Sequence, residues 1–163
     1  MSRPMVRAAM VALTLISSAG AAQAQTQYQQ AISANPFGLL LEFFNGEYER
    51  VVTESSTAGF GGSFYSPDEE EYLNADLFFR YYPQGRPLDG WAFGAKAGVT
   101  KVEDYGTYFG FGFDVNHSWL LGSNENFYVG IGLGLKRLVG VDEGDDLIDY
   151  VPTIRLVNVG FAF

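Results

Sequence analysis

The chain has 163 residues, of which 47% are hydrophobic, 16% aromatic and only 18% charged, and its formal net charge is −9. An acidic chain without basic clusters is a poor nucleic-acid binder, and the absence of cysteine excludes disulfides, thiol chemistry and cysteine-ligated zinc. Twenty glycines beside this many aromatic residues are typical of a barrel of alternating strands.

The first 24 residues have the parts of a secretory signal peptide. Two arginines make the start positive, a short apolar run follows, and Ala22-Gln23-Ala24 is a small-x-small cleavage site. We expect cleavage after Ala24 and one mature domain over residues 25–163. Loss of the two arginines lowers the net charge from −9 to −11.

The start of the mature chain is polar, and we expect a short first strand over residues 27–35. Asn35-Pro36-Phe37-Gly38 is then a tight turn. Residues 39–52 form a long strand-like run whose apolar face changes near Asn45-Gly46, which predicts a β-bulge. The alternative, an Asn-Gly hairpin, would leave two pieces shorter than the roughly 9 to 11 residues that a membrane-spanning strand needs.

Six later segments alternate between large apolar residues and small or polar ones, which is the period of a β-strand. These segments are residues 58–65, 72–82, 91–101, 109–119, 127–136 and 150–163. In the last of them, Arg155 joins the polar face only if one residue is bulged, so we predict a second β-bulge near Leu156-Val157.

The face opposite the large apolar residues is mostly glycine and small residues. Such a face cannot cover the outside of a soluble sandwich, but it fits inside a narrow barrel. The predicted fold is all-β, an eight-stranded antiparallel up-and-down transmembrane β-barrel, whose closure leaves no unpaired strand edge in lipid. Acidic connections at residues 66–71, 103–105 and 140–149 alternate with the others. We expect the acidic set to be extracellular and the C-terminus periplasmic, in the bacterial outer membrane.

Parity places eight charged residues on the inward face: Glu47, Glu49, Asp76, Arg80, Lys96, Asp114, Lys136 and Arg155. Four acids and four bases in a narrow lumen should pair, because an unpaired buried charge costs several kcal/mol. This predicts a lumen plugged by side-chain ion pairs. The alternative is a gate or a narrow polar pore.

Aromatic residues near the predicted strand ends suit the two membrane interfaces, although an exposed sugar-binding patch is an alternative. They are Tyr81, Trp91, Trp119 and Tyr150, together with Tyr82, Tyr105 and Tyr108. At the C-terminus, Val159, Phe161 and Phe163 share the outward face.

We expect no catalytic residue, cofactor or metal. The one histidine, His117, precedes Ser118, and adjacent strand residues point to opposite faces, so the two cannot form a dyad. The acidic run at residues 142–149 lacks the ligand spacing of a calcium loop. A weak calcium bridge from this run to lipopolysaccharide phosphates is the alternative.

Several short motifs resemble those of small outer-membrane barrels. They are Asn35-Pro36-Phe37-Gly38, Glu47-Tyr48-Glu49-Arg50, Arg80-Tyr81-Tyr82-Pro83 and the terminal Phe161-Ala162-Phe163. The chain is similar to the barrels of domain of unknown function 3575 and, more loosely, to OmpA/OmpX-type and OmpW-type barrels. The resemblance implies two partners: outer-membrane lipid with lipopolysaccharide, and the barrel-assembly machinery acting through the C-terminal strand. It carries over no catalytic residue.

The sequence therefore predicts a small outer-membrane barrel protein, not an enzyme, with a structural or surface-interaction role. One alternative is a narrow conduit for small or hydrophobic solutes. A second alternative is an outer-membrane lipid-modifying enzyme.

Overall fold

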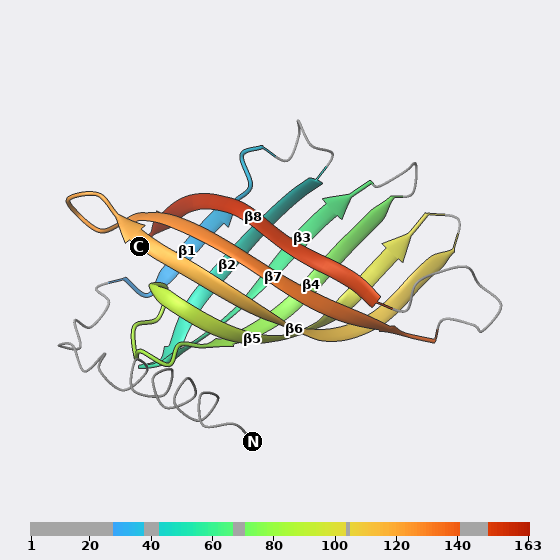
Figure 1. Ribbon diagram of the computed structural model, residues 1–163, viewed down its shortest axis with the longest axis horizontal. Coiled ribbons are helices and arrows are strands. Elements are labelled where there is room, and N and C mark those ends of the chain that lie inside the picture. The colour runs from blue at the N-terminus through green and yellow to red at the C-terminus, as the bar shows by residue number, and fades with distance from the viewer. Residues whose placement is uncertain (1–27, 38–42, 67–70, 104, 141–149) are drawn as a thin grey trace, which may run out of the picture.

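Alternating residues form eight antiparallel strands that close into one barrel in chain order (Figure 1). The strands are β1 (Gln30–Ala34), β2 (Phe43–Thr53), β3 (Ser56–Tyr65), β4 (Tyr72–Tyr81), β5 (Gly90–Val102), β6 (Gly106–Leu121), β7 (Phe127–Val139) and β8 (Tyr150–Ala162). This computed structural model describes residues 28–37, 43–66, 71–103, 105–140 and 150–163. The predicted signal peptide and the acidic run at residues 142–149 lie outside the described residues.

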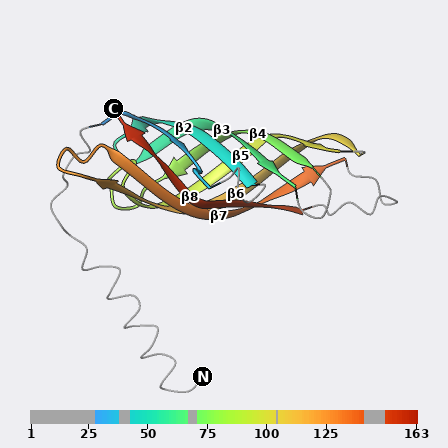
Figure 2. The same ribbon diagram turned by 90° about the horizontal axis from the view of Figure 1, so that it is seen from above.

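Because the strands run alternately up and down, β1, β3, β5 and β7 finish at one end of the barrel, here called the upper end. β2, β4, β6 and β8 finish at the other end, the lower end, where the C-terminus lies (Figures 1 and 2). Among the described residues, no helix is long and apolar enough to cross a membrane.

The barrel is polar inside and apolar outside. Among the described residues, 15 polar or charged side chains are buried, against 11 hydrophobic ones. Large hydrophobic side chains project from the outer wall instead, with Leu77 69% exposed, Leu133 67% and Phe113 64%. A water-soluble domain has the opposite arrangement, because burial of apolar surface is what stabilises it.

The predicted bulge in the last strand is confirmed. β8 has one more residue between Arg155 and Asn158 than β7 has between Gly132 and Gly130, and the pairing register shifts at this point. The extra residue lies at Leu156-Val157. It allows both Arg155, 5% exposed, and Asn158, fully buried, to face the lumen.

The predicted bulge at Asn45-Gly46 is wrong. Pairing between β2 and β3 continues unbroken from Phe43 to Val51, and the register shifts only between Val51 and Thr53. The prediction assumed that Phe43 faces outward, whereas its ring is 8% exposed and lines a cavity in the lumen. Gly61 on β3 lines the same cavity.

Neighbouring strands of the barrel are staggered. The size of the stagger is found by following paired residues once around the barrel. From Glu49, successive paired residues lead through Gly59, Phe78, Lys96, Gly112 and Lys136 to Val151. In the other direction, Glu49 pairs with Ala31, which pairs with Ala162. Ala162 is 11 residues beyond Val151, one of them the bulge residue, so the stagger is ten residues. A barrel with this stagger has strongly tilted strands.

β1 is the shortest strand, with five residues where residues 27–35 were predicted. It pairs with β8 only from Val159 to Ala162, at the lower end. Within the described residues, β8 from Tyr150 to Asn158 pairs with β7 alone. Among the described residues, β1 therefore separates β2 from β8 only in the lower part of the wall.

Candidate functional site

The eight charged residues of the inward face all lie inside the barrel. Arg80, Glu49 and Lys136 are at most 2% exposed, and Asp114 and Arg155 are also buried. The side chains of Glu47 and Asp76 are each 14% exposed, and that of Lys96 is 10% exposed. They come from β2, β4, β5, β6, β7 and β8, so the ring of strands positions them together.

Arg80 lies at the centre of these charges. One Nη donates to Glu49 at 2.8 Å, and the two Nη atoms donate to the two oxygens of Glu47 at 3.0 and 3.1 Å. Asp114 lies 3.7 Å away. The guanidinium fork suits this geometry because it can serve several carboxylate oxygens at once.

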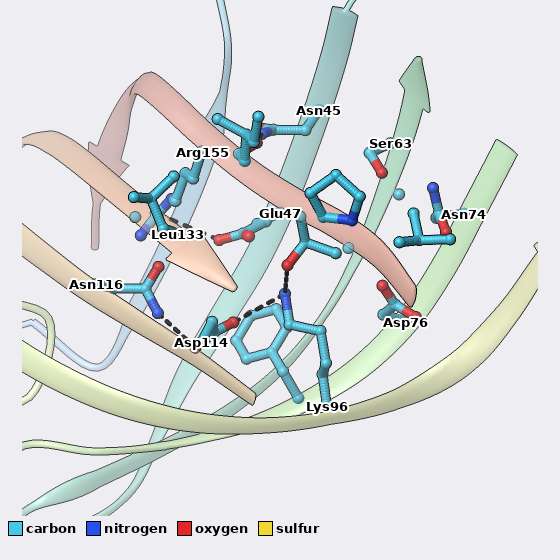
Figure 3. A pocket seen from close by; sticks show the side chains of 18 of the residues that line it. Asn45, Glu47, Ser63, Asn74, Asp76, Lys96, Asp114, Asn116, Leu133 and Arg155 are labelled. Atoms are coloured by element: carbon cyan, nitrogen blue, oxygen red, sulfur yellow. Dashed lines mark hydrogen bonds and ion pairs between the residues drawn. The ribbon is translucent and has the colours of Figure 1, made fainter. Parts of the chain in front are cut away.

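Two further cations extend the network. Arg155 lies 3.3 Å from Glu47, and Lys96 lies 3.0 Å from both Asp114 and the hydroxyl of Thr153 (Figure 3). Six of the eight charges thus form one connected network. The other two, Lys136 and Asp76, form a separate pair at 2.6 Å.

Neutral side chains complete the hydrogen bonding of the buried carboxylates. Glu49 accepts from the hydroxyls of Thr57 at 2.5 Å and Tyr82 at 2.7 Å. Asp114 accepts from the Asn116 amide at 2.5 Å. Such bonds matter because a buried charge is tolerated only when its remaining lone pairs are satisfied.

Tyr82 and Tyr108 were predicted at the membrane interface, and this is wrong for both. Tyr82 is 1% exposed with its hydroxyl on Glu49. Every second side chain of β4 faces inward, and Tyr82 is two residues after the inward Arg80. The same alternation would therefore have placed Tyr82 inside. Tyr108 is half-buried and packs against a small apolar cluster of Val102, Leu138 and Val151 near the upper end.

The inward glycines make room for the long charged side chains. A Cβ added to Gly130 would lie 2.7 Å from the guanidinium carbon of Arg155. One added to Gly110 would lie 2.9 Å from Cγ of Lys136. The glycine-rich inner face and the ion pairs are therefore parts of one arrangement, since a larger residue would displace the charges.

Leu88 lies in the connection between β4 and β5, near the lower end of the barrel. It is fully buried against Ala31, Tyr128 and Ala162. Its φ of 69° is in the left-handed region, which costs a residue with a Cβ roughly 1–2 kcal/mol. Burial of the side chain offsets that cost. Sequence reasoning missed this contact because leucine carries no turn signal.

A cavity of about 50 Å³ lies beside the network on its upper side (Figure 3). Its lining includes Asn45, Ser63, Asp76, Arg80, Lys96, Asp114, Asn116, Thr153 and Arg155.

The remaining predicted residues lie on the outer wall. Tyr81, Trp91, Trp119 and Tyr150 are between 38% and 50% exposed, and Phe161 and Phe163 are more than half exposed. Val159 is partly exposed beside them. The ring of His117 packs between Trp91 and Trp119, with centroids 4.8 and 4.3 Å apart, whereas Ser118 is buried on the inner face.

Within the described ranges, no cluster of three or more histidine, cysteine or acidic side chains could hold a metal ion. The acidic run at residues 142–149, the candidate for weak calcium binding, lies outside those ranges.

No protein-family model matches the sequence, and no curated protein matches it. The resemblance to the barrels of domain of unknown function 3575 is therefore not confirmed. Among solved structures, the chain is similar to the N-terminal β-barrel domain of Pseudomonas aeruginosa OprF, with 16% sequence identity and a TM-score of 0.44. The match covers 82% of this chain and 94% of that one. A likeness at this level carries no argument about function.

Proposed function

We propose that this chain is a small outer-membrane barrel protein with a structural or surface-interaction role and a lumen closed by ion pairs. The observation that carries the proposal is the reversed burial: polar and charged side chains inside, large apolar ones outside. A closed barrel with such a wall pairs its strands with one another and presents hydrocarbon to lipid.

Closure of the lumen is supported by two layers. The charged layer around Arg80 fills the middle, and the cluster around Leu88 fills the lower end. In a barrel of eight strands, side chains of ordinary size suffice to fill the interior. A narrow conduit is the second candidate, and the cavity beside the network is the observation that favours it.

The orientation belongs to the same proposal. The upper end, which carries the longer acidic connections, faces the exterior, and the C-terminus faces the periplasm. Lipid and lipopolysaccharide surround the apolar wall. Val159, Phe161 and Phe163, on the outward face at the C-terminal end of the chain, are the residues that we assign to recognition by the barrel-assembly machinery.

Lipid-modifying activity has no support in the geometry, since His117 and Ser118 lie on opposite faces of β6. The mass of lipid A in cells with and without the protein tests it. We expect the same mass in both; a shift of one acyl chain would establish an enzyme.

Purified mature protein in detergent tests the proposal as a whole. We expect a compact gel band that shifts on boiling, as barrels with intact strands do, and no steady channels in planar bilayers. A protein that is monomeric without detergent would refute membrane insertion. Steady channels of porin size, in a sample that keeps the band shift, would refute only the plug.

A further inference from the structure

The few charges on the outer wall are all positive. Among the strand residues that the structure describes, three charged side chains face outward and are exposed: Arg50 near the lower end, and Lys101 and Arg137 toward the upper end. The carboxylates of the same strands face the lumen instead. In a chain whose net charge is −9, a wall with only positive charges suits an anionic partner.

Lys101 and Arg137 lie at the same level of the wall on two different strands. On β5 the outward residues from Trp91 onward are apolar, and Lys101 is the first charged one. On β7 the outward residues from Phe127 onward are apolar, and Arg137 is the first charged one. Each cation is ten residues beyond that first aromatic residue. Ten residues at about 3.4 Å each, in strands tilted by about 40°, rise about 26 Å. The apolar band of an outer-membrane barrel is roughly 25 Å tall, so both cations lie at the upper interface, the level of lipid phosphates.

Only β6 separates the two cations (Figure 1). Lys101 pairs with Thr107, and Arg137 pairs with Phe111, four residues further along β6. Four residues along a strand and two strand spacings across it place the two Cα atoms roughly 16 Å apart. The stagger of ten residues in eight strands raises each step toward β7 by about 1.25 residues, which offsets most of the four residues down β6. The two Cα atoms therefore differ in height by only about 4 Å.

Neither cation has an ionic partner in the described part of the chain. The salt bridges there lie in the lumen or in the connection between β4 and β5. The exposed Glu71 and Glu103 follow Lys101 toward the upper end, and neither forms an ion pair with it. Arg137 lies 5.9 Å from the ring of Tyr150, which is 46% exposed. Basic and aromatic side chains together are typical of a membrane interface, and a guanidinium matches phosphate with two N–H groups.

We propose that Lys101 and Arg137 bind the two phosphates of one lipopolysaccharide molecule through its lipid A head. A phospholipid with one phosphate would meet only one of the two cations. Phe109 projects from β6 between them, 54% exposed, and it pairs with Val99 and Val139 on the neighbouring strands. These apolar side chains offer hydrocarbon to the acyl chains. The inference rests on the proposed orientation, which places the upper end in the outer leaflet.

Native mass spectrometry of the mature barrel in dodecyl-dimethylamine oxide tests the site, with bisphosphorylated lipid A as the probe. We expect one saturable molecule per barrel, and binding about tenfold weaker for the same lipid with one phosphate removed, because one charge-assisted contact is lost. Lys101→Gln and Arg137→Gln should each weaken binding of the bisphosphorylated lipid about tenfold for the same reason. The double variant should bind the two lipids equally.

Arg50→Gln is the matched control, because it removes the outward cation near the opposite end. It should change binding by less than about twofold, since a distant exposed charge is screened. Weakening by Arg50→Gln equal to that by Arg137→Gln would overturn the site and leave only general charge attraction. Equal binding of lipid A by wild type and the double variant would also overturn it. Tighter binding of phosphatidylglycerol than of lipid A would overturn the choice of lipid.

The heat-dependent band shift, measured on every sample, separates this inference from the proposed function. If the shift is present and binding does not depend on Lys101 and Arg137, the lipid site is wrong and the membrane barrel stands. If wild type shows no shift, the membrane barrel itself is wrong.

Discussion

Arg80→Met is the substitution with the largest expected effect on stability. The guanidinium contacts Glu49 at 2.8 Å, Glu47 at 3.0 and 3.1 Å, and Asp114 at 3.7 Å. Methionine keeps an unbranched apolar stem but is shorter and carries no charge. Glu47 would keep Arg155, but Glu49 would keep only the hydroxyls of Thr57 and Tyr82.

The expected loss of stability arises because Glu49 would remain buried without a cation beside it. Removing one partner of a buried ion pair typically costs about 3–5 kcal/mol. We expect a loss of that size in the free energy of unfolding, measured by urea titration in detergent with the heat-dependent gel band as the signal. Arg50→Met, at an exposed position on β2, is the matched control and should change stability by no more than about 0.5 kcal/mol.

A second variant separates loss of charge from loss of packing. Arg80→Met combined with Glu49→Gln returns the charged network around Arg80 to zero net charge. The hydroxyls of Thr57 and Tyr82 can still donate to the amide oxygen of the introduced glutamine. We expect the double variant to recover at least about half of the loss, because neutral replacements of buried ion pairs are often tolerated. A loss below about 1 kcal/mol in Arg80→Met, or a double variant less stable than the single one, would refute the reasoning.

Three further outcomes are expected. Gly130→Ala places a methyl 2.7 Å from the Arg155 guanidinium and should destabilise the barrel by about 1–3 kcal/mol in the same titration, whereas Gly62→Ala, whose nearest neighbour would be 3.4 Å away, should be tolerated. Leu88→Ala should cost about 2–5 kcal/mol for its lost burial, with no relief of left-handed strain because alanine keeps the Cβ; full stability would argue against a closed lower end. Deletion of Phe163 should lower the amount of assembled barrel in cells without changing refolding in detergent, and equal amounts in cells would remove its assigned role in assembly.

The strands and the inward charges could be predicted because period two is a local property. Arg80 and Lys96 need only their neighbours in sequence to be assigned a face. The bulge at Leu156-Val157 could be predicted for the same reason, since Arg155 and Asn158 cannot share a face without it.

The partners within the lumen could not be predicted, because they depend on the stagger. Arg80 meets Glu47 across 33 residues and Lys136 meets Asp76 across 60, and parity alone fits many pairings. Phe43 and Tyr82 were misplaced because an aromatic residue was taken to face outward, whereas both rings are buried inside the barrel. The short β1 and the buried Leu88 result from tertiary packing and have no local pattern.

Fluorescence of the native tryptophans tests the central claim most directly, because the chain has only two and both lie on the outer wall. The mature protein is reconstituted into vesicles whose acyl chains carry bromine at defined depths. We predict strong quenching by bromines near the head groups and little by acrylamide in the aqueous phase. Efficient quenching by acrylamide with no effect of brominated lipid would contradict a wall that faces hydrocarbon.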